Sequence, residues 1–196
     1  MKIIIISIIV FFVQSTFAID ASSKRVAFGF SDSKGTSVGG TFHPGEEINW
    51  KFSRTRSGIE LTSQEEDSTN NHMIEAYLMR TDMLFNSIEK YIETINKNLI
   101  EAFAVGGQWR LVSVIFEPEA SKPRCARGHI LLRDRSNNKD VDARFSEQFI
   151  LSCALERHAP FGIEVRYYHR YKGGNRDAEF STKANQLLNS IEVEDK

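Results

Sequence analysis

The alternation of apolar and polar residues predicts that most of this chain forms short strands. Strands are expected where apolar or β-branched residues occupy every second position, or form a short run, between turn signals. The expected strands are residues 25–30, 48–52, 59–61, 73–79, 109–116, 127–133, 141–155 and 163–171. Of these, 109–116 is expected to be buried. Residues 31–40 are rich in glycine and serine and predict a loop, and the charged residues 192–196 predict a frayed end.

Two other stretches have the spacing of amphipathic helices. Before the first, at about 87–104, Asn86 and Glu89 have the spacing of a capping box, with Asn86 as the cap. Two consecutive glycines then end this helix. The second helix is expected at about 178–191, where apolar residues again recur one turn apart. Because antiparallel strands need only short turns, this order predicts an α+β domain, with a mainly antiparallel sheet packed by two helices.

The start of the chain has the pattern of a secretory signal peptide. Lys2 is followed by an apolar run over residues 3–13, and Ala18 is the small residue that a signal peptidase requires. The run is shorter than the about 20 residues that span a bilayer, although a short membrane anchor is the alternative. We therefore expect residues 1–18 to be a signal peptide and residues 19–196 a single domain. The mature protein is expected to be periplasmic or secreted, without stable insertion into the membrane.

The chain has two cysteines, Cys125 and Cys153. In an oxidising compartment such a pair favours a disulfide, and no histidines at short spacing are present to complete a structural zinc site. Folding the strands on either side of Asn138 into a hairpin brings Cys125 nearly opposite Leu151, within one bulge of Cys153. We therefore expect a disulfide that closes the open end of this hairpin.

The order of the expected elements also suggests a resemblance to a known fold. A strand at 73–79 is followed by a capped helix at 86–104, a meander of strands and a last helix that contains Phe180 and Leu187. In this order the chain resembles the Mog1/PsbP-like α/β sandwich fold. The resemblance covers the later part of the chain and includes no signature motif. The cysteine pair and the glycine-rich N-terminal part are not expected of that group. The resemblance therefore implies a fold and assigns no functional residue.

Charge limits the kinds of partner that the protein can have. With 25 basic and 26 acidic residues the formal net charge is −1, which does not favour nucleic acid. Residues 166–172, however, are locally basic and rich in tyrosine, and both arginine and tyrosine are enriched at the energetic centres of protein interfaces. The alternative is a solvated strand face paired with Glu147 or Glu156. The candidate binding residues are Arg166, Tyr168, His169, Arg170 and Lys172, together with Arg133 and Arg135 on the neighbouring hairpin.

Two patterns bear on catalysis. Residues 35–39 match the Gly-x-Ser-x-Gly pattern of serine hydrolases, but Ser37 would act only on a turn from a strand into a helix. Further turn residues follow here, so a flexible loop is expected instead. Of the five histidines, His129 and His169 are expected to share one face of the sheet, with Glu164 as a neighbouring carboxylate. We expect no catalytic residue, no metal site and no cofactor.

These observations predict an exported, non-catalytic domain that binds another protein. A periplasmic inhibitor such as an immunity protein, or an accessory subunit of a secretion system, fits this description. One alternative is a small periplasmic hydrolase, which requires a pocket that joins Ser37 or His169 to an acidic partner. Another is a structural component of the envelope.

Overall fold

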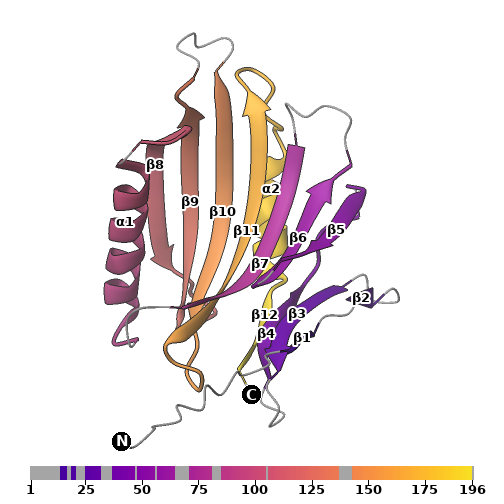
Figure 1. The fold of residues 1–196 in the computed structure, drawn as a ribbon, viewed down its shortest axis with the longest axis vertical. Coiled ribbons are helices and arrows are strands. Elements are labelled where there is room, and N and C mark those ends of the chain that lie inside the picture. The colour runs from indigo at the N-terminus through magenta and orange to yellow at the C-terminus, as the bar shows by residue number, and fades with distance from the viewer. Residues whose placement is uncertain are drawn as a thin grey trace, which may run out of the picture.

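The computed structural model describes residues 14–16, 19–20, 25–31, 37–46, 48–55, 57–64, 71–80, 85–104, 106–136 and 143–195. In these residues the chain forms two antiparallel sheets and two α-helices (Figure 1). The larger sheet has the strand order β5 (Trp50–Arg54), β6 (Gly58–Ser63), β7 (Asn71–Arg80), β11 (Phe161–Lys172), β10 (Arg144–Ala154), β9 (Cys125–Asp134) and β8 (Trp109–Pro118). The smaller sheet has the order β1 (Gln14–Thr16), β3 (Arg25–Ser31), β4 (Ser37–Phe42) and β12 (Glu192–Asp195), and β2 (Ile19–Asp20) also pairs with β3. The helices are α1 (Ile88–Ala104) and α2 (Phe180–Asn189).

This architecture confirms the predicted α+β fold with mainly antiparallel sheets and two helices. Both helices form where the periodicity predicts them, although α2 is shorter than expected. The cap of α1 differs from the prediction, because Ser87 Oγ rather than the Asn86 side chain accepts a hydrogen bond from the Lys90 N–H, at 3.3 Å. A hydroxyl in this position satisfies one of the backbone donors that the first helical turn leaves without a partner.

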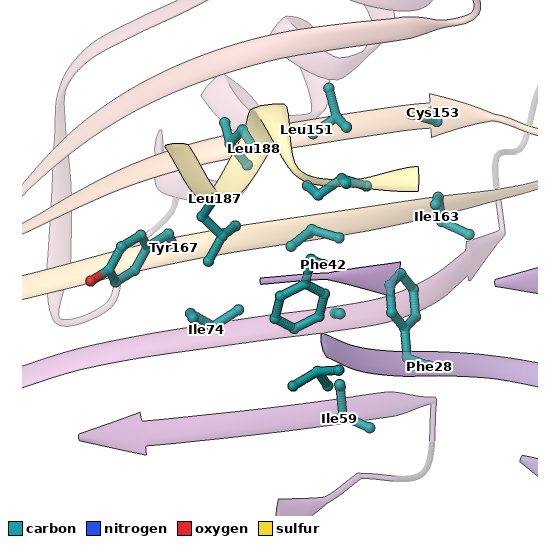
Figure 2. Close-up of a cluster of buried hydrophobic side chains, with 14 of the residues drawn as sticks. Phe28, Phe42, Ile59, Ile74, Leu151, Cys153, Ile163, Tyr167, Leu187 and Leu188 are labelled. Carbon is teal, nitrogen blue, oxygen red and sulfur yellow. The ribbon is translucent and has the colours of Figure 1, made fainter. Parts of the chain in front are cut away.

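Buried side chains form two clusters, one on each face of the larger sheet. Along β10, Leu151 belongs to the first cluster and Ile150 to the second, as strand alternation requires. The first face is covered by α2 and the smaller sheet, where Leu188 and Phe42 are fully buried (Figure 2). The second face is covered by α1, whose Tyr91 is buried against the sheet. Burial of each such apolar side chain stabilises the fold by about 1.5–3 kcal/mol.

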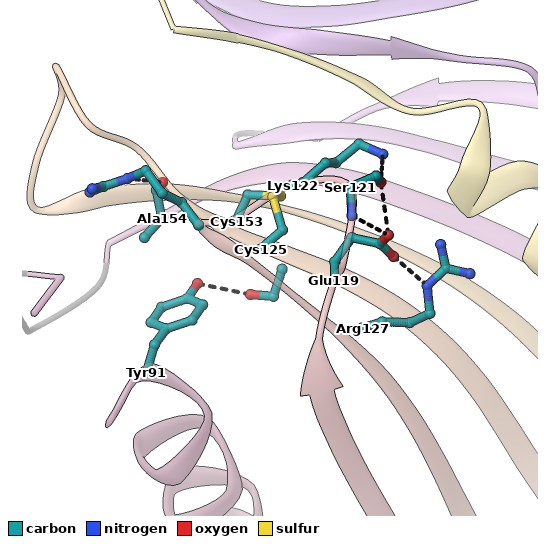
Figure 3. Close-up of a disulfide and its surroundings, with 10 residues drawn as sticks. Tyr91, Glu119, Ser121, Lys122, Cys125, Arg127, Cys153 and Ala154 are labelled. Atoms are coloured by element: carbon teal, nitrogen blue, oxygen red, sulfur yellow. Dashed lines mark hydrogen bonds and ion pairs between the residues drawn. A yellow bond between two sulfur atoms is a disulfide. The ribbon is translucent and has the colours of Figure 1, made fainter. Parts of the chain in front are cut away.

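The predicted disulfide between Cys125 and Cys153 is confirmed (Figure 3). The two residues lie directly opposite each other in β9 and β10, whereas Leu151 lies opposite Arg127, so the predicted register was wrong by two residues. Near the disulfide, the Glu119 carboxylate accepts a hydrogen bond from Arg127 Nε at 2.7 Å, which ties the turn before β9 to that strand. The disulfide therefore joins the ends of β9 and β10 that lie farthest from the turn connecting them.

The prediction of a loop at 31–40 was wrong for residue 31, which ends β3, and for residues 37–40, which belong to β4. Gly39 lies opposite Gly29 of β3, and a Cβ at position 39 would come within 2.1 Å of the Phe28 carbonyl oxygen. The glycines therefore permit two strands to approach closely. Residues 32–36 of the predicted loop lie outside the described residues.

Two further expectations about strands were wrong. Residues 192–195 do not fray, because they form β12 and pair with β4. Asp195 accepts hydrogen bonds from the N–H groups of Glu156 and Arg157, at 2.6 and 3.0 Å, so ordered backbone holds this charged segment. The strand expected to be buried at 109–116 is β8 at the edge of the larger sheet, where Val112 and Ile115 are about half exposed.

Most of the predicted signal peptide lies outside the described residues. Residues 1–13 and 17–18 are not described, whereas Gln14–Thr16 form β1, opposite β3. Cleavage after Ala18 would remove β1 and leave β2 in place. Among the helices that the structure describes, neither is long and apolar enough to cross a membrane. The leader at 1–18 therefore stays a prediction from sequence.

Candidate binding surface and the polar cluster beside it

Basic side chains gather at one end of the larger sheet, where β8 and β10 begin and β9 and β11 end (the upper end in Figure 1). The register places Arg110 opposite Arg133, and Arg144 opposite Lys172. Like charges directly opposite each other destabilise a sheet in the absence of compensating interactions. We call the following residues the basic end: Arg110, Arg133, Arg135, Arg144, Arg170, Lys172 and Arg176.

Two carboxylates of the strands that form the basic end are buried. Asp134 accepts hydrogen bonds from the Ser136 N–H and hydroxyl, at 2.8 and 2.7 Å, and from Gln108 at 3.1 Å. The bonds from Ser136 hold the pKa of Asp134 below its ordinary value. The Glu147 carboxylate is buried as well and forms an ion pair with Arg176. Arg144, by contrast, is exposed.

Three of the predicted binding residues are engaged inside the protein. Arg166 donates to Glu164, and the Tyr168 hydroxyl donates to Glu75. His169 is fully buried on the opposite face of β11. The tyrosine-rich segment that suggests an interface in the sequence is therefore divided between two faces of a strand, and an acidic neighbour binds Arg166.

The remaining predicted residues lie at the basic end. Arg170 is exposed and Lys172 is half-buried. Arg135 donates to the carbonyl oxygens of Phe103 and Trp109, at 2.9 and 3.3 Å, which fixes the end of α1 to the start of β8. The sequence prediction missed Arg110, whose place in the sheet depends on an irregularity in the pairing of β8 with β9 after residue 111.

A polar cluster lies beside the basic end, on the face that α2 covers. His72 of β7 is directly opposite His169 of β11, and the two imidazole rings stack with their centroids 4.5 Å apart and their planes 12° apart. The hydroxyl of Tyr167 is 3.2 Å from His72 Nδ1, and Asp177 Oδ2 is 3.7 Å from His72 Nε2. Burial lowers the pKa of both histidines, that of His169 to about 4. Both rings are therefore neutral at pH 7.

Glu147 is the charged residue on the otherwise apolar face of β10. It accepts hydrogen bonds from Arg176 Nε and Nη2, at 2.6 and 2.9 Å, and lies 2.9 Å from His129 Nε2. Burial opposes its ionisation, but the hydrogen bonds from His129 and Arg176 outweigh this effect and lower the pKa of Glu147 to about 2. His129 and His169 share this face of the sheet, whereas Glu164 lies on the opposite face and is not their neighbour.

A pocket of about 430 Å³ opens between α2 and residues 43–48. Tyr167, Lys183 and Leu187 contribute to its wall, and His169 is not among the described residues that line it. Ser37 begins strand β4, so it does not lie on the strand-to-helix turn that a hydrolase nucleophile needs. Within the described ranges, no three His, Cys, Asp or Glu side chains are placed to hold a metal ion together.

Comparison with known proteins assigns neither a family nor a function to this chain. No protein-family model matches the chain, and no curated protein matches it significantly. The resemblance to the Mog1/PsbP-like fold stays a prediction from the order of elements.

Proposed function

We propose that this chain is an exported, non-catalytic domain that binds an acidic surface of another protein through its basic end. The observation that carries the proposal is the register of the larger sheet, which places Arg110 opposite Arg133 and Arg144 opposite Lys172 at the same end. An acidic partner would present charge complementary to these side chains, and complementary charge speeds association. The inhibitor or accessory-subunit roles expected from the sequence belong to this class.

Export is supported by the sequence pattern of residues 1–18 and by the disulfide, because disulfides persist mainly in oxidising compartments. A protein partner is favoured over nucleic acid because the chain as a whole has a net charge of −1. Its positive charge is local, and a partner must match it over one limited surface.

Charge reversal at the basic end tests the proposal. Arg144 and Arg170 are both exposed, so the double variant Arg144→Glu/Arg170→Glu is expected to fold. Lys90→Glu/Lys97→Glu on the exposed side of α1 makes the same change in net charge away from the basic end. Each tagged full-length protein would be expressed in the native host, cross-linked, recovered and analysed by mass spectrometry.

We expect the wild type and the α1 control to recover the same acidic partner, and the basic-end variant to recover at least about tenfold less of it. A tenfold loss corresponds to about 1.4 kcal/mol of binding free energy. Recovery should also fall with added salt, because the contact is electrostatic. Equal recovery by both variants, or a wild type that carries no partner, would refute the proposal.

A further inference from the structure

The stacked histidines join α2 to the larger sheet. Phe180, the first residue of α2, is fully buried, with its ring centroid 5.0 Å from that of His169 and 5.8 Å from that of His72. Tyr171 stacks on the other side of His169 at 4.9 Å. His169 is fully buried and His72 is 4% exposed, so water reaches neither ring freely. The beginning of α2 therefore rests on two imidazoles that are surrounded mainly by aromatic rings.

Charged groups lie around the two histidines. Asp177 is the nearest, at 3.7 Å from His72, and it also accepts from Lys183 Nζ at 3.1 Å and from the Glu179 N–H at 2.8 Å. On the other side, Glu147 is held by Arg176 and His129. The titratable and charged groups that face the pair are thus Tyr167 and Tyr171 on β11, His129 on β9, Glu147 on β10, Arg176 and Asp177 before α2, and Lys183 on α2.

We propose that the His72–His169 pair is an acid-sensitive latch, which holds the first turns of α2 on the sheet while both rings are neutral and releases them when the pair takes up a proton. Two cationic rings cannot remain stacked 4.5 Å apart in an apolar setting, and a charge on either buried ring loses most of its hydration. Opening of α2 gives the protonated ring access to water. The latch concerns the fold alone and does not depend on what the basic end binds.

The sign and size of the effect follow from linkage. A histidine whose pKa is lowered by folding stabilises the closed state fully above its ordinary value of 6.5, and this contribution is lost as the pH falls from there through the folded value. With a folded value of about 4 for His169, lowering the pH from 7.5 to 5 raises the opening constant of α2 about 25-fold. Proton uptake by His72 adds to the effect in the same direction.

Hydrogen exchange of the full-length protein at pH 7.5 and pH 5, corrected for the intrinsic rate of each amide, measures this opening. We expect the protection factors of α2 amides to fall about 25-fold while those of β9 and β10 change much less. His169→Phe keeps an aromatic ring but cannot titrate, and its α2 should lose most of this response. His43→Phe removes an exposed histidine outside the pair and should respond like the wild type.

An NMR titration of the histidine rings in the wild type provides a readout that needs no variant. The rings of His72 and His169 should both titrate clearly below pH 6.5. Unchanged protection of α2 at pH 5, an equal fall in all strands, or ordinary titration of both rings would each overturn the latch.

Discussion

Reduction of the Cys125–Cys153 disulfide offers the sharpest test of the energetics of this fold. The bond joins residues 28 positions apart, at the open end of the β9–β10 hairpin. Both cysteines are buried, at 4% and 1% exposure, and the thiols formed by reduction stay in the same core. Reduction therefore changes the freedom of the unfolded chain much more than the contacts of the folded one.

The expected magnitude follows from the length of the closed loop. In the chain-entropy treatment, a bond across a loop of this length reduces the entropy of the unfolded state enough to stabilise the fold by about 3.5 kcal/mol. This is a large part of the stability of a typical domain, about 5–15 kcal/mol. For a protein of this size it corresponds to a fall in Tm of about 7–14 °C on reduction.

Urea unfolding followed by circular dichroism, with and without dithiothreitol, measures this difference. The double variant Cys125→Ala/Cys153→Ala serves as the control, since its stability should not respond to the reductant. A difference between oxidised and reduced wild type below about 1 kcal/mol would refute the reasoning, because it would mean that the unfolded hairpin is already constrained without the bond.

Two further predictions concern single positions. Gly39→Ala should lower the free energy of unfolding in urea by about 2 kcal/mol or more, because the new Cβ would lie 2.1 Å from the Phe28 carbonyl oxygen. The control Gly45→Ala, which has open space around it, should lower the free energy of unfolding by about 1 kcal/mol. Because folding lowers the pKa of Glu147, the ionised carboxylate stabilises the fold fully above pH 4.5. The free energy of unfolding should fall by about 3 kcal/mol as the pH decreases from 4.5 through 2. Glu147→Gln should flatten this acid dependence of unfolding, and an unchanged slope would contradict the assignment.

The elements that the sequence predicts well are those whose signal is local. Periodicity locates α1 and α2, and alternation locates β7, β9, β10 and β11. Two failures depend on pairing with other strands. β4 has the composition of a turn but is held between β3 and β12, and β12 has the composition of a frayed tail but pairs with β4, which lies far earlier in the chain. A partner so distant in the chain leaves no local pattern.

The sequence likewise predicts only part of the candidate surface. Basic residues near the ends of β9 and β11 are visible in the sequence, but alternation alone does not tell which of them acidic neighbours will bind. Arg166 is paired with Glu164 two residues away on its own strand, whereas Arg170 stays exposed. The contact between His72 and His169 depends on the register of two strands far apart in the chain, so no spacing in the sequence indicates it.

The pairing of β12 with β4 has a consequence for how the molecule is made. β12 consists of residues 192–195, which the ribosome adds after every other described element, and Asp195 also fastens the turn between β10 and β11. A growing polypeptide therefore carries β4 with an open edge until residues 192–195 have been added. The smaller sheet, as the structure describes it, is therefore complete only after β12 has been made.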